Sequence, residues 1–310
     1  MEPIYGPVFT IYPSFNHDFT VDLRGTIRYA TYLIEAGARW LYLMPYNGRY
    51  NQLSDSEIES LGGALIRLIG PLHATNIIVA VPINYSTQAT YALMNRWSEL
   101  GEFCVSSLVG ERLYSSQQLV DHYSYLNEFG MPIVAHEMPM IAGISGELVS
   151  WPSECLIEIS ELPNVVGIKE DSKSVQYATD ILDRKPGAPL IFAGRKSFFG
   201  ELVTAGLNCY LNGISMVEPR LAFKFFHLIE NYDNEGCRTE MQRFIREVDD
   251  PFWDDLVTSF GWHRVNRASL FYFNLLDKTE RSPMPQLTAK EYQHLSNFWD
   301  RHKEVINGWI

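Results

Sequence analysis

Eight short apolar segments, separated by amphipathic stretches, recur along the sequence and limit what this chain can fold into. Each is rich in β-branched or aromatic residues, which is typical of buried strands. Eight strands with helices between them favour one parallel (β/α)8 barrel, an α/β fold, over an open doubly wound sheet. The dinucleotide-binding form of the open sheet is further disfavoured because no G-x-G-x-x-G follows the first strand. The expected strands are Val8–Tyr12, Trp40–Pro45, Ile77–Pro82, Phe103–Leu108, Pro132–His136, Val165–Lys169, Leu190–Ala193 and Cys209–Asn212.

Helical patterns fill the intervals and continue beyond the last strand. Asp22 is a candidate N-cap, and Ser54 with Glu57 has the spacing of a capping box. The expected barrel helices are Leu23–Glu35, Asp55–Ile69, Thr87–Leu100, Gln117–Phe129, Pro152–Leu162, Val175–Leu182, Phe198–Ala205 and Leu221–Asn231. Further helices are expected at Thr239–Val248, at Pro251–Leu276 with a break near Gly261, and at Ala289–Ile306. We therefore predict a barrel over residues 1–235 and a C-terminal helical appendage, packed on it, over residues 236–310.

Composition narrows the class of function. The formal net charge of −12 argues against a nucleic-acid partner, which needs a basic surface, although a local basic pocket can still hold an anionic substrate. The four cysteines form no C-x-x-C pair, so we expect reduced thiols and neither a zinc site nor a disulfide framework. No signal-peptide pattern and no apolar stretch of about 18 residues is present, so we predict a cytoplasmic protein without a membrane partner.

A lysine near the end of the sixth expected strand is the strongest functional signal. Side chains alternate along a strand, so Val165, Gly167 and Lys169 share one face, and Glu170 lies on the other. A strand buried on both faces should be almost wholly apolar, and barrel enzymes place their chemistry at the carboxyl ends of strands. Burial disfavours the ammonium form of a lysine, and the neutral amine can attack a ketone to form an iminium. A structural ion pair with Asp171 is the alternative reading of this lysine.

The motifs around this lysine resemble those of the dihydrodipicolinate synthase/N-acetylneuraminate lyase family of pyruvate-dependent aldolases and lyases. Residues 163–172, Pro-Asn-Val-Val-Gly-Ile-Lys-Glu-Asp-Ser, are close to the family's P-N-[IV]-V-G-[IL]-K-[DE]-x-[ST]. Leu53-Ser54-x-x-Glu57 matches its L-[ST]-x-x-E, and the resemblance runs from about Gly6 to Pro219. It implies a (β/α)8 barrel, a Schiff base at Lys169, no separate cofactor, and a homo-oligomer, either a tetramer or a dimer.

Two segments depart from the family's pattern where substrate is expected. The family's G-[TN]-T-G-E loop, which holds the pyruvate carboxylate, is here Pro-Tyr46-Asn47-Gly48-Arg49, in which only Gly48 matches. Asn47 stands at the key threonine position and can donate through its amide. The family's Y-N-x-P after strand five is here His136-Glu137-Met138-Pro139, so His136 replaces the proton-relay tyrosine. Histidine can also relay protons.

Other positions bear on the choice of substrate. Ile141 stands where dihydrodipicolinate synthases carry a carboxylate-binding arginine, which disfavours that activity. Arg112 aligns loosely with the family's interface tyrosine, with an exposed surface arginine as the alternative. Arg195 and Lys196 follow the seventh strand, where barrels often bind phosphate, so Arg195 is a candidate substrate contact and an exposed basic turn is the alternative. Tyr210, on the eighth strand, completes the candidate set.

We therefore expect a carbon–carbon lyase or aldolase that acts on a 2-keto acid or sugar acid. Lys169 is the expected nucleophile and His136 the expected proton relay, while Tyr46, Asn47 and Gly48 contact the substrate. A dehydratase that uses the same iminium, or a non-catalytic ligand-binding barrel, are the alternatives. A metal-dependent aldolase is disfavoured because no H-x-H or closely spaced His/Asp/Glu set is present.

Overall fold

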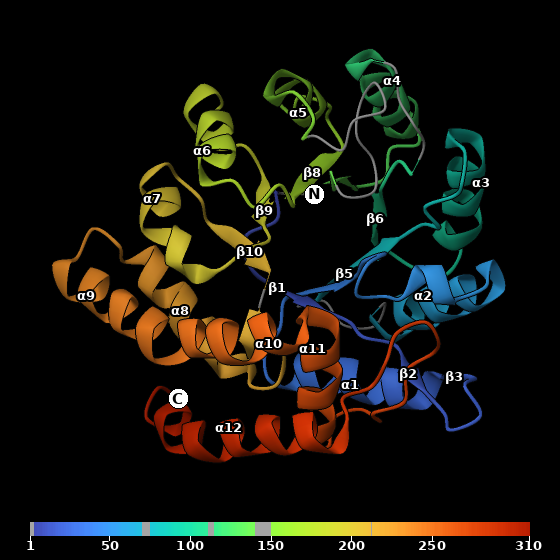
Figure 1. Cartoon of the computed structure of the whole chain (residues 1–310). Coiled ribbons are helices and arrows are strands. Elements are labelled where there is room, and N and C mark those ends of the chain that lie inside the picture. Colours follow the sequence, from blue (N-terminus) through green and yellow to red (C-terminus); the bar gives the residue numbers. More distant parts are fainter. Residues whose placement is uncertain (1–2, 70–74, 111–114, 140–149, 212) are drawn as a thin grey trace. The chain divides into compact units, whose positions relative to one another are not determined.

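Eight parallel strands form a closed barrel (Figure 1). The computed structural model describes residues 3–69, 75–110, 115–139, 150–211 and 213–310. Around the barrel the strands follow the order β1, β10, β9, β8, β7, β6, β5, β4. They are β1 (Gly6–Thr10), β4 (Trp40–Leu43), β5 (Asn76–Ala80), β6 (Cys104–Ser107), β7 (Ile133–Glu137), β8 (Val165–Glu170), β9 (Leu190–Phe192) and β10 (Cys209–Leu211). The predicted barrel is confirmed, and every strand boundary lies within two residues of its expected position.

The chain divides into two compact units. The first comprises Met1–Thr10, Arg39–Gly194 and Glu201–Leu211, and it holds all eight barrel strands. The second comprises Ile11–Ala38, Arg195–Gly200 and Asn212–Ile310. The expected domain boundary at residue 235 stays a prediction.

Helices of the first unit lie around the outside of its strands (Figure 1). They are α2 (Asp55–Ile69), α3 (Thr87–Ser98), α4 (Ser116–Asn127), α5 (Ser153–Ser160) and α6 (Val175–Arg184). The predicted capping box is present at α2, since the Ser54 amide donates to Glu57 Oε2 at 2.9 Å and the Glu57 amide donates to Ser54 Oγ at 3.3 Å. The apolar face of α2 is fully buried at Leu61 and Leu65, which fixes the helix against the barrel core. The 3-10 segment η1 (Tyr50–Gln52) precedes α2, and α7 (Phe199–Thr204) follows β9.

The second unit is mostly helical. Its helices are α1 (Leu23–Glu35), α8 (Pro219–Glu230), α9 (Glu235–Phe244), α10 (Thr258–Phe260), α11 (Trp262–Tyr272) and α12 (Ala289–Asn307). The expected break occurs at Gly261, whose φ of 82° ends α10 before α11 begins. Short segments complete the unit: the antiparallel pair β2 (Ser14–Phe15) and β3 (Val21–Asp22), the 3-10 turns η2 (Lys196–Phe198) and η3 (Gly213–Met216), and the π-helical η4 (Ile245–Asp249) and η5 (Phe252–Val257).

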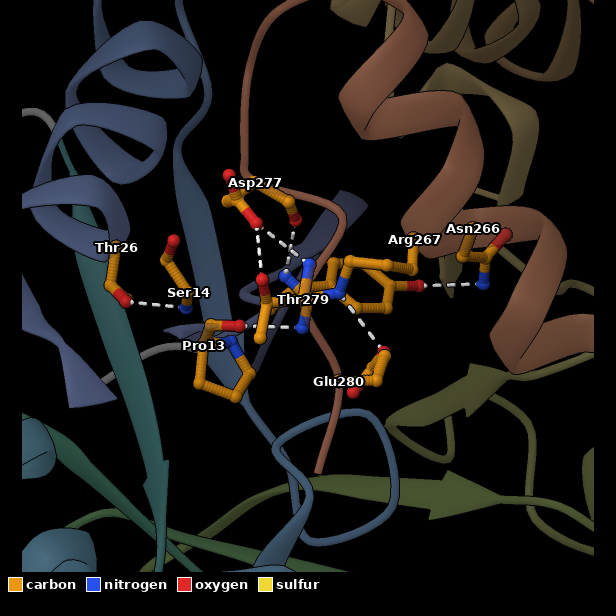
Figure 2. Close-up of polar contacts among 9 residues, drawn as sticks. Pro13, Ser14, Thr26, Asn266, Arg267, Asp277, Thr279 and Glu280 are labelled. Atoms are coloured by element: carbon orange, nitrogen blue, oxygen red, sulfur yellow. Dashed lines mark hydrogen bonds and ion pairs between the residues drawn. The ribbon is translucent and has the colours of Figure 1, made fainter. Parts of the chain in front are cut away.

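A buried arginine links distant segments of the second unit (Figure 2). Arg267 on α11 donates from Nε to Glu280 Oε1 at 2.9 Å and from Nη2 to the carbonyl of Pro13 at 2.6 Å. Next to it, Asn266 donates to the Tyr12 hydroxyl at 2.9 Å. Burial of this ion pair is tolerated because the guanidinium is hydrogen-bonded on two sides. Residues some 250 positions apart in sequence are thereby fixed together.

The structure also describes the cysteines and bears on membrane-spanning helices. All four cysteines are free thiols, as expected. Within the described residues, no helix is both long enough and apolar enough to cross a membrane.

Candidate active site

Lys169 and His136 lie side by side at the carboxyl ends of neighbouring strands. They are register partners on β8 and β7, so their side chains leave the sheet on the same face. Both residues are almost fully buried, with His136 at 0% and Lys169 at 1% exposure. The structure therefore brings together the predicted nucleophile and the predicted relay.

Contacts between non-neighbouring strands show that this face points into the barrel. The rings of Tyr42 on β4 and His136 on β7 lie 6.4 Å apart, although β5 and β6 separate those strands in the sheet. The Tyr42 hydroxyl is also 2.5 Å from Ser106 Oγ on β6. Such contacts are possible only across the interior of a closed barrel. Sequence reasoning missed Tyr42 and Ser106, because a tyrosine in an apolar strand looks like an ordinary core residue.

The lower part of the interior is filled. A Cβ added at Gly167 would lie 2.9 Å from Ile4 Cδ1 and 3.1 Å from Ile191 Cδ1. A Cβ at these distances would force the ends of the two isoleucine side chains to move, so the small size of glycine allows this close packing. Lys169, two residues further along the same face, therefore stands above a closed apolar floor.

The imidazole of His136 is neutral and has no protein partner among the described residues. Neither Nδ1 nor Nε2 has a hydrogen-bond partner, although both atoms are buried. Burial, followed by the positive charge of Lys169, holds the pKa of His136 well below its usual value. Buried polar atoms are normally satisfied, so two unpaired nitrogens on one ring indicate a position for a water molecule or a ligand.

Lys169 forms an ion pair with Asp171, the alternative that the sequence left open. The ammonium nitrogen lies 2.8 Å from Asp171 Oδ2, and the side chains are 2% and 11% exposed. The Asp171 amide donates to Glu137 Oε2 at 3.3 Å, which anchors this residue to β7. The amine is therefore close to a carboxylate that can hold or accept a proton.

The loop after β4 carries the predicted carboxylate-binding residues. Its amides at Gly48, Arg49 and Tyr50 donate to carbonyls of the same turn, at 2.7, 3.3 and 3.1 Å. A Cβ at Gly48 would lie 2.4 Å from the Met44 carbonyl, so the turn requires glycine there. Asn47 is buried at 4% exposure, whereas Tyr46 is 37% exposed. Because three amides already serve the turn, the side chains of Tyr46 and Asn47 are the better candidates to meet a substrate.

Two buried carboxyl groups lie behind the site, on the helix-facing side of β7 and β8. Glu137 and Glu170 are register partners and both are fully buried. Burial, and then the neighbouring Glu170, raises the pKa of Glu137 to about 8, and burial raises that of Glu170 to about 7. Two adjacent carboxylates cannot both ionise cheaply in a buried place, so the pair keeps at least one proton at neutral pH, held mainly by Glu137. Sequence reasoning did not predict this pair, although it placed Glu170 on the opposite face of the strand from Lys169.

Arg195 and Lys196 have carboxylate partners within the second unit. Arg195 lies 2.9 Å from Asp250 and 2.8 Å from Asp254, and Lys196 is buried with its ammonium 3.4 Å from Asp249. Lys196 is 1% exposed, which rules out the exposed basic turn as a description of this residue. These pairs satisfy the charge of both cations, so a substrate contact by Arg195 stays a prediction without support from its geometry.

Tyr210 lies on the other face of the sheet from Lys169. It pairs in register with Phe192, which in turn pairs with Glu170. Its predicted substrate contact therefore stays a prediction that the register does not favour.

Two other residues that the sequence analysis singled out, Arg112 and Ile141, lie outside the described residues. Among the described residues, no group of three or more His, Cys, Asp or Glu side chains is arranged to hold a metal ion.

A closed parallel barrel that buries a lysine and an unpaired histidine at its strand ends has the form of a barrel enzyme site. The chain belongs to the dihydrodipicolinate synthetase family, which it matches over residues 5–301. It is a divergent member: a 4-hydroxy-tetrahydrodipicolinate synthase of Desulforamulus reducens is 23% identical over 94% of this chain and 96% of that protein. An uncharacterized DapA-like lyase of Halobacterium salinarum is 22% identical over 79% of this chain and 78% of that protein.

Solved structures agree on the fold. The 4-hydroxy-tetrahydrodipicolinate synthase of Methylacidiphilum fumariolicum superposes with a TM-score of 0.80 at 19% identity, covering 99% of this chain and 98% of that one. The dihydrodipicolinate synthase of Acinetobacter baumannii, solved with pyruvate, gives 0.78 at 18% identity, covering 97% and 99%. The chain therefore has the lyase fold of this family, as the resemblance implied.

Proposed function

We propose that this protein is a class I carbon–carbon lyase or aldolase that binds a 2-keto acid covalently through Lys169. The observation that carries the proposal is a buried amine beside a neutral, unpartnered imidazole inside the barrel. Family membership supports it, because the motif around Lys169 resembles the family's Schiff-base motif. No cofactor is needed, since the iminium itself withdraws electrons from the adjacent carbon.

The proposed chemistry begins when the Lys169 nitrogen adds to the keto carbon and the keto oxygen leaves as water. The resulting C=N⁺ group acidifies the neighbouring C–H bond, and the neutral His136 accepts that proton to give an enamine. In the synthetic direction the enamine carbon attacks an acceptor carbonyl, and in the cleavage direction the same bond breaks. The hydroxyl pair of Tyr42 and Ser106, close to His136, can pass a proton to or from the acceptor oxygen.

Tyr46 and Asn47 are proposed to meet the substrate carboxylate in place of the family's hydroxyl pair. The pyruvate in the Acinetobacter baumannii structure supports pyruvate as the first donor to test. On the same family basis we propose a cytoplasmic homo-oligomer, either a dimer or a tetramer.

Covalent trapping tests this function directly. Borohydride added with pyruvate should reduce the imine and leave a stable adduct, which peptide mass spectrometry should locate at Lys169. Lys169→Ala should give no adduct. Lys173→Ala, which removes an exposed lysine nearby in the sequence, should be labelled to the same extent as the wild type. Absence of an adduct in the wild type across a panel of 2-keto acids, or an adduct that persists in Lys169→Ala, would refute the proposal.

Removal of the Tyr42 hydroxyl should impair turnover more than imine formation. We expect Tyr42→Phe to lower kcat about tenfold, less than the roughly 10²–10⁴-fold that a general acid–base group contributes, because Ser106 remains in place. Pyruvate trapping should continue near the wild-type rate. Tyr29→Phe is the matched control, since it removes another buried hydroxyl, which donates to the Met216 carbonyl at 3.0 Å. Equal kcat values for the two variants would exclude Tyr42 from the relay.

A further inference from the structure

Asp171 occupies a position that the Lys169 motif leaves variable, yet it makes the closest polar contact with the lysine. Its carboxylate oxygen is 2.8 Å from the ammonium nitrogen, within direct proton-transfer distance. Both side chains are nearly excluded from water, at 2% and 11% exposure. A proton that leaves this amine therefore has a carboxylate beside it and little solvent to receive it.

The other groups near the amine are less suited to take that proton. His136 is kept neutral by burial and by the charge of Lys169, so a proton on its ring would be unfavourable while the ammonium is present. Tyr42 and Tyr46 have pKa values raised by burial and, in part, by the charge of Asp171, and a phenol that keeps its proton cannot accept another. Glu170 follows Lys169 in sequence but lies on the opposite face of β8.

We propose that Asp171 is the proton shuttle for imine formation and the counter-ion of the iminium; this inference rests on the proposed Schiff-base function. Asp171 first accepts a proton from the Lys169 ammonium, which leaves a neutral amine and a neutral carboxylic acid. The amine nitrogen adds to the keto carbon, and the nitrogen's second proton passes to the oxygen to give a carbinolamine. Asp171 then returns its proton to that hydroxyl, which leaves as water.

Charge and atoms balance over this sequence. The ammonium and carboxylate of the resting enzyme become an iminium and a carboxylate, and one water molecule is released. Because the ion pair is re-formed around the new C=N⁺ group, the site never has to hold an isolated buried charge at either end of the step. The carboxylate keeps its place throughout, since the Asp171 amide is held by Glu137.

The rate of trapping, rather than its final extent, tests this role. Asp171→Asn should slow pyruvate-dependent trapping at Lys169 about 10²-fold, as expected for loss of a general acid–base group, and the final adduct should still form. Asp171→Glu should recover part of the rate. Asp171→Ala should slow trapping as much as Asp171→Asn does. With two neutral variants, the test still stands if one of them folds poorly. The thermal unfolding of each variant should be measured alongside its trapping rate, so that a loss of folding is recognised.

Glu170→Gln is the matched control, because it neutralises the adjacent carboxyl on the opposite face and should trap pyruvate within about threefold of the wild-type rate. If Asp171→Asn traps as fast as Glu170→Gln, the shuttle is wrong although the Schiff base stands. If the wild type itself gives no adduct with any keto acid, the proposed function has failed and this inference falls with it. The two failures are thus distinguished by the wild-type result.

Discussion

Replacing His136 with phenylalanine is expected to lower kcat by about 10²–10⁴-fold while pyruvate still forms an adduct with Lys169. The ring nitrogens of His136 are the buried atoms on this face that lack a hydrogen-bond partner among the described residues. Phenylalanine keeps a ring of similar shape but can neither accept nor donate a proton. The loss should therefore appear in steps after imine formation, which steady-state kinetics and single-turnover trapping separate.

Two further variants sharpen this test. His136→Tyr restores the residue that the family uses and should recover activity relative to His136→Phe. His122→Phe is the matched control: His122 is also a buried imidazole, but it is hydrogen-bonded to Ser107 and Thr87 at 2.9 and 2.8 Å. Comparable losses of kcat in His136→Phe and His122→Phe would show that a general packing defect, and not proton transfer, is responsible.

The Glu137–Glu170 pair should make the protein less stable as pH rises, and Glu137→Gln should remove much of that dependence. In the folded state the pKa of Glu137 is raised to about 8 and that of Glu170 to about 7. In the unfolded chain a glutamate ionises near pH 4.3. The unfolded chain thus holds fewer protons than the native state between about pH 4.3 and pH 8, so stability falls as pH increases through that window.

Thermal unfolding at two pH values measures the effect. At pH 5 the carboxyl groups are mostly protonated in the folded state, and Glu137→Gln should leave Tm nearly unchanged. At pH 8.5 the variant should be stabilised by roughly 2 kcal/mol, which corresponds to a rise in Tm of about 3 °C for a chain of 310 residues. Glu99→Gln, at an exposed position, should show no pH-dependent difference. A Tm gain for Glu137→Gln that is the same at both pH values would show that the carboxyl pair is not the cause.

The sequence predicted the barrel well because its strands are short, apolar and regularly spaced. Strand alternation and the family motif together also singled out Lys169, and the motif singled out His136, which the register of β7 and β8 places on the same face. The β2–β3 pair was missed because strands of two residues have no recognisable period. Strands were therefore predicted correctly where the apolar segment was long enough to show a pattern.

Contacts between distant segments could not be predicted. Tyr42 meets Ser106 and His136 only because the barrel closes, and no local pattern distinguishes it from a core tyrosine. Arg195 looked available for an anionic substrate, but its carboxylate partners lie 55 and 59 positions away in sequence. The chemical character of single residues could be predicted from the sequence, whereas the pairing of their charges with partners distant in sequence could not.

Gly167 has a stereochemical consequence for the reaction proposed above. Its missing side chain is replaced by the packed ends of Ile4, Ile191 and Val134, so the barrel is closed below Lys169. Any enamine attached to that lysine would have protein beneath it, and an acceptor would have to approach from the open, carboxyl end of the strands. Carbon–carbon bond formation should then occur on a single face of the enamine, so a keto acid with a substituted carbon beside the keto group, such as 2-oxobutanoate, should give one configuration at that carbon in excess.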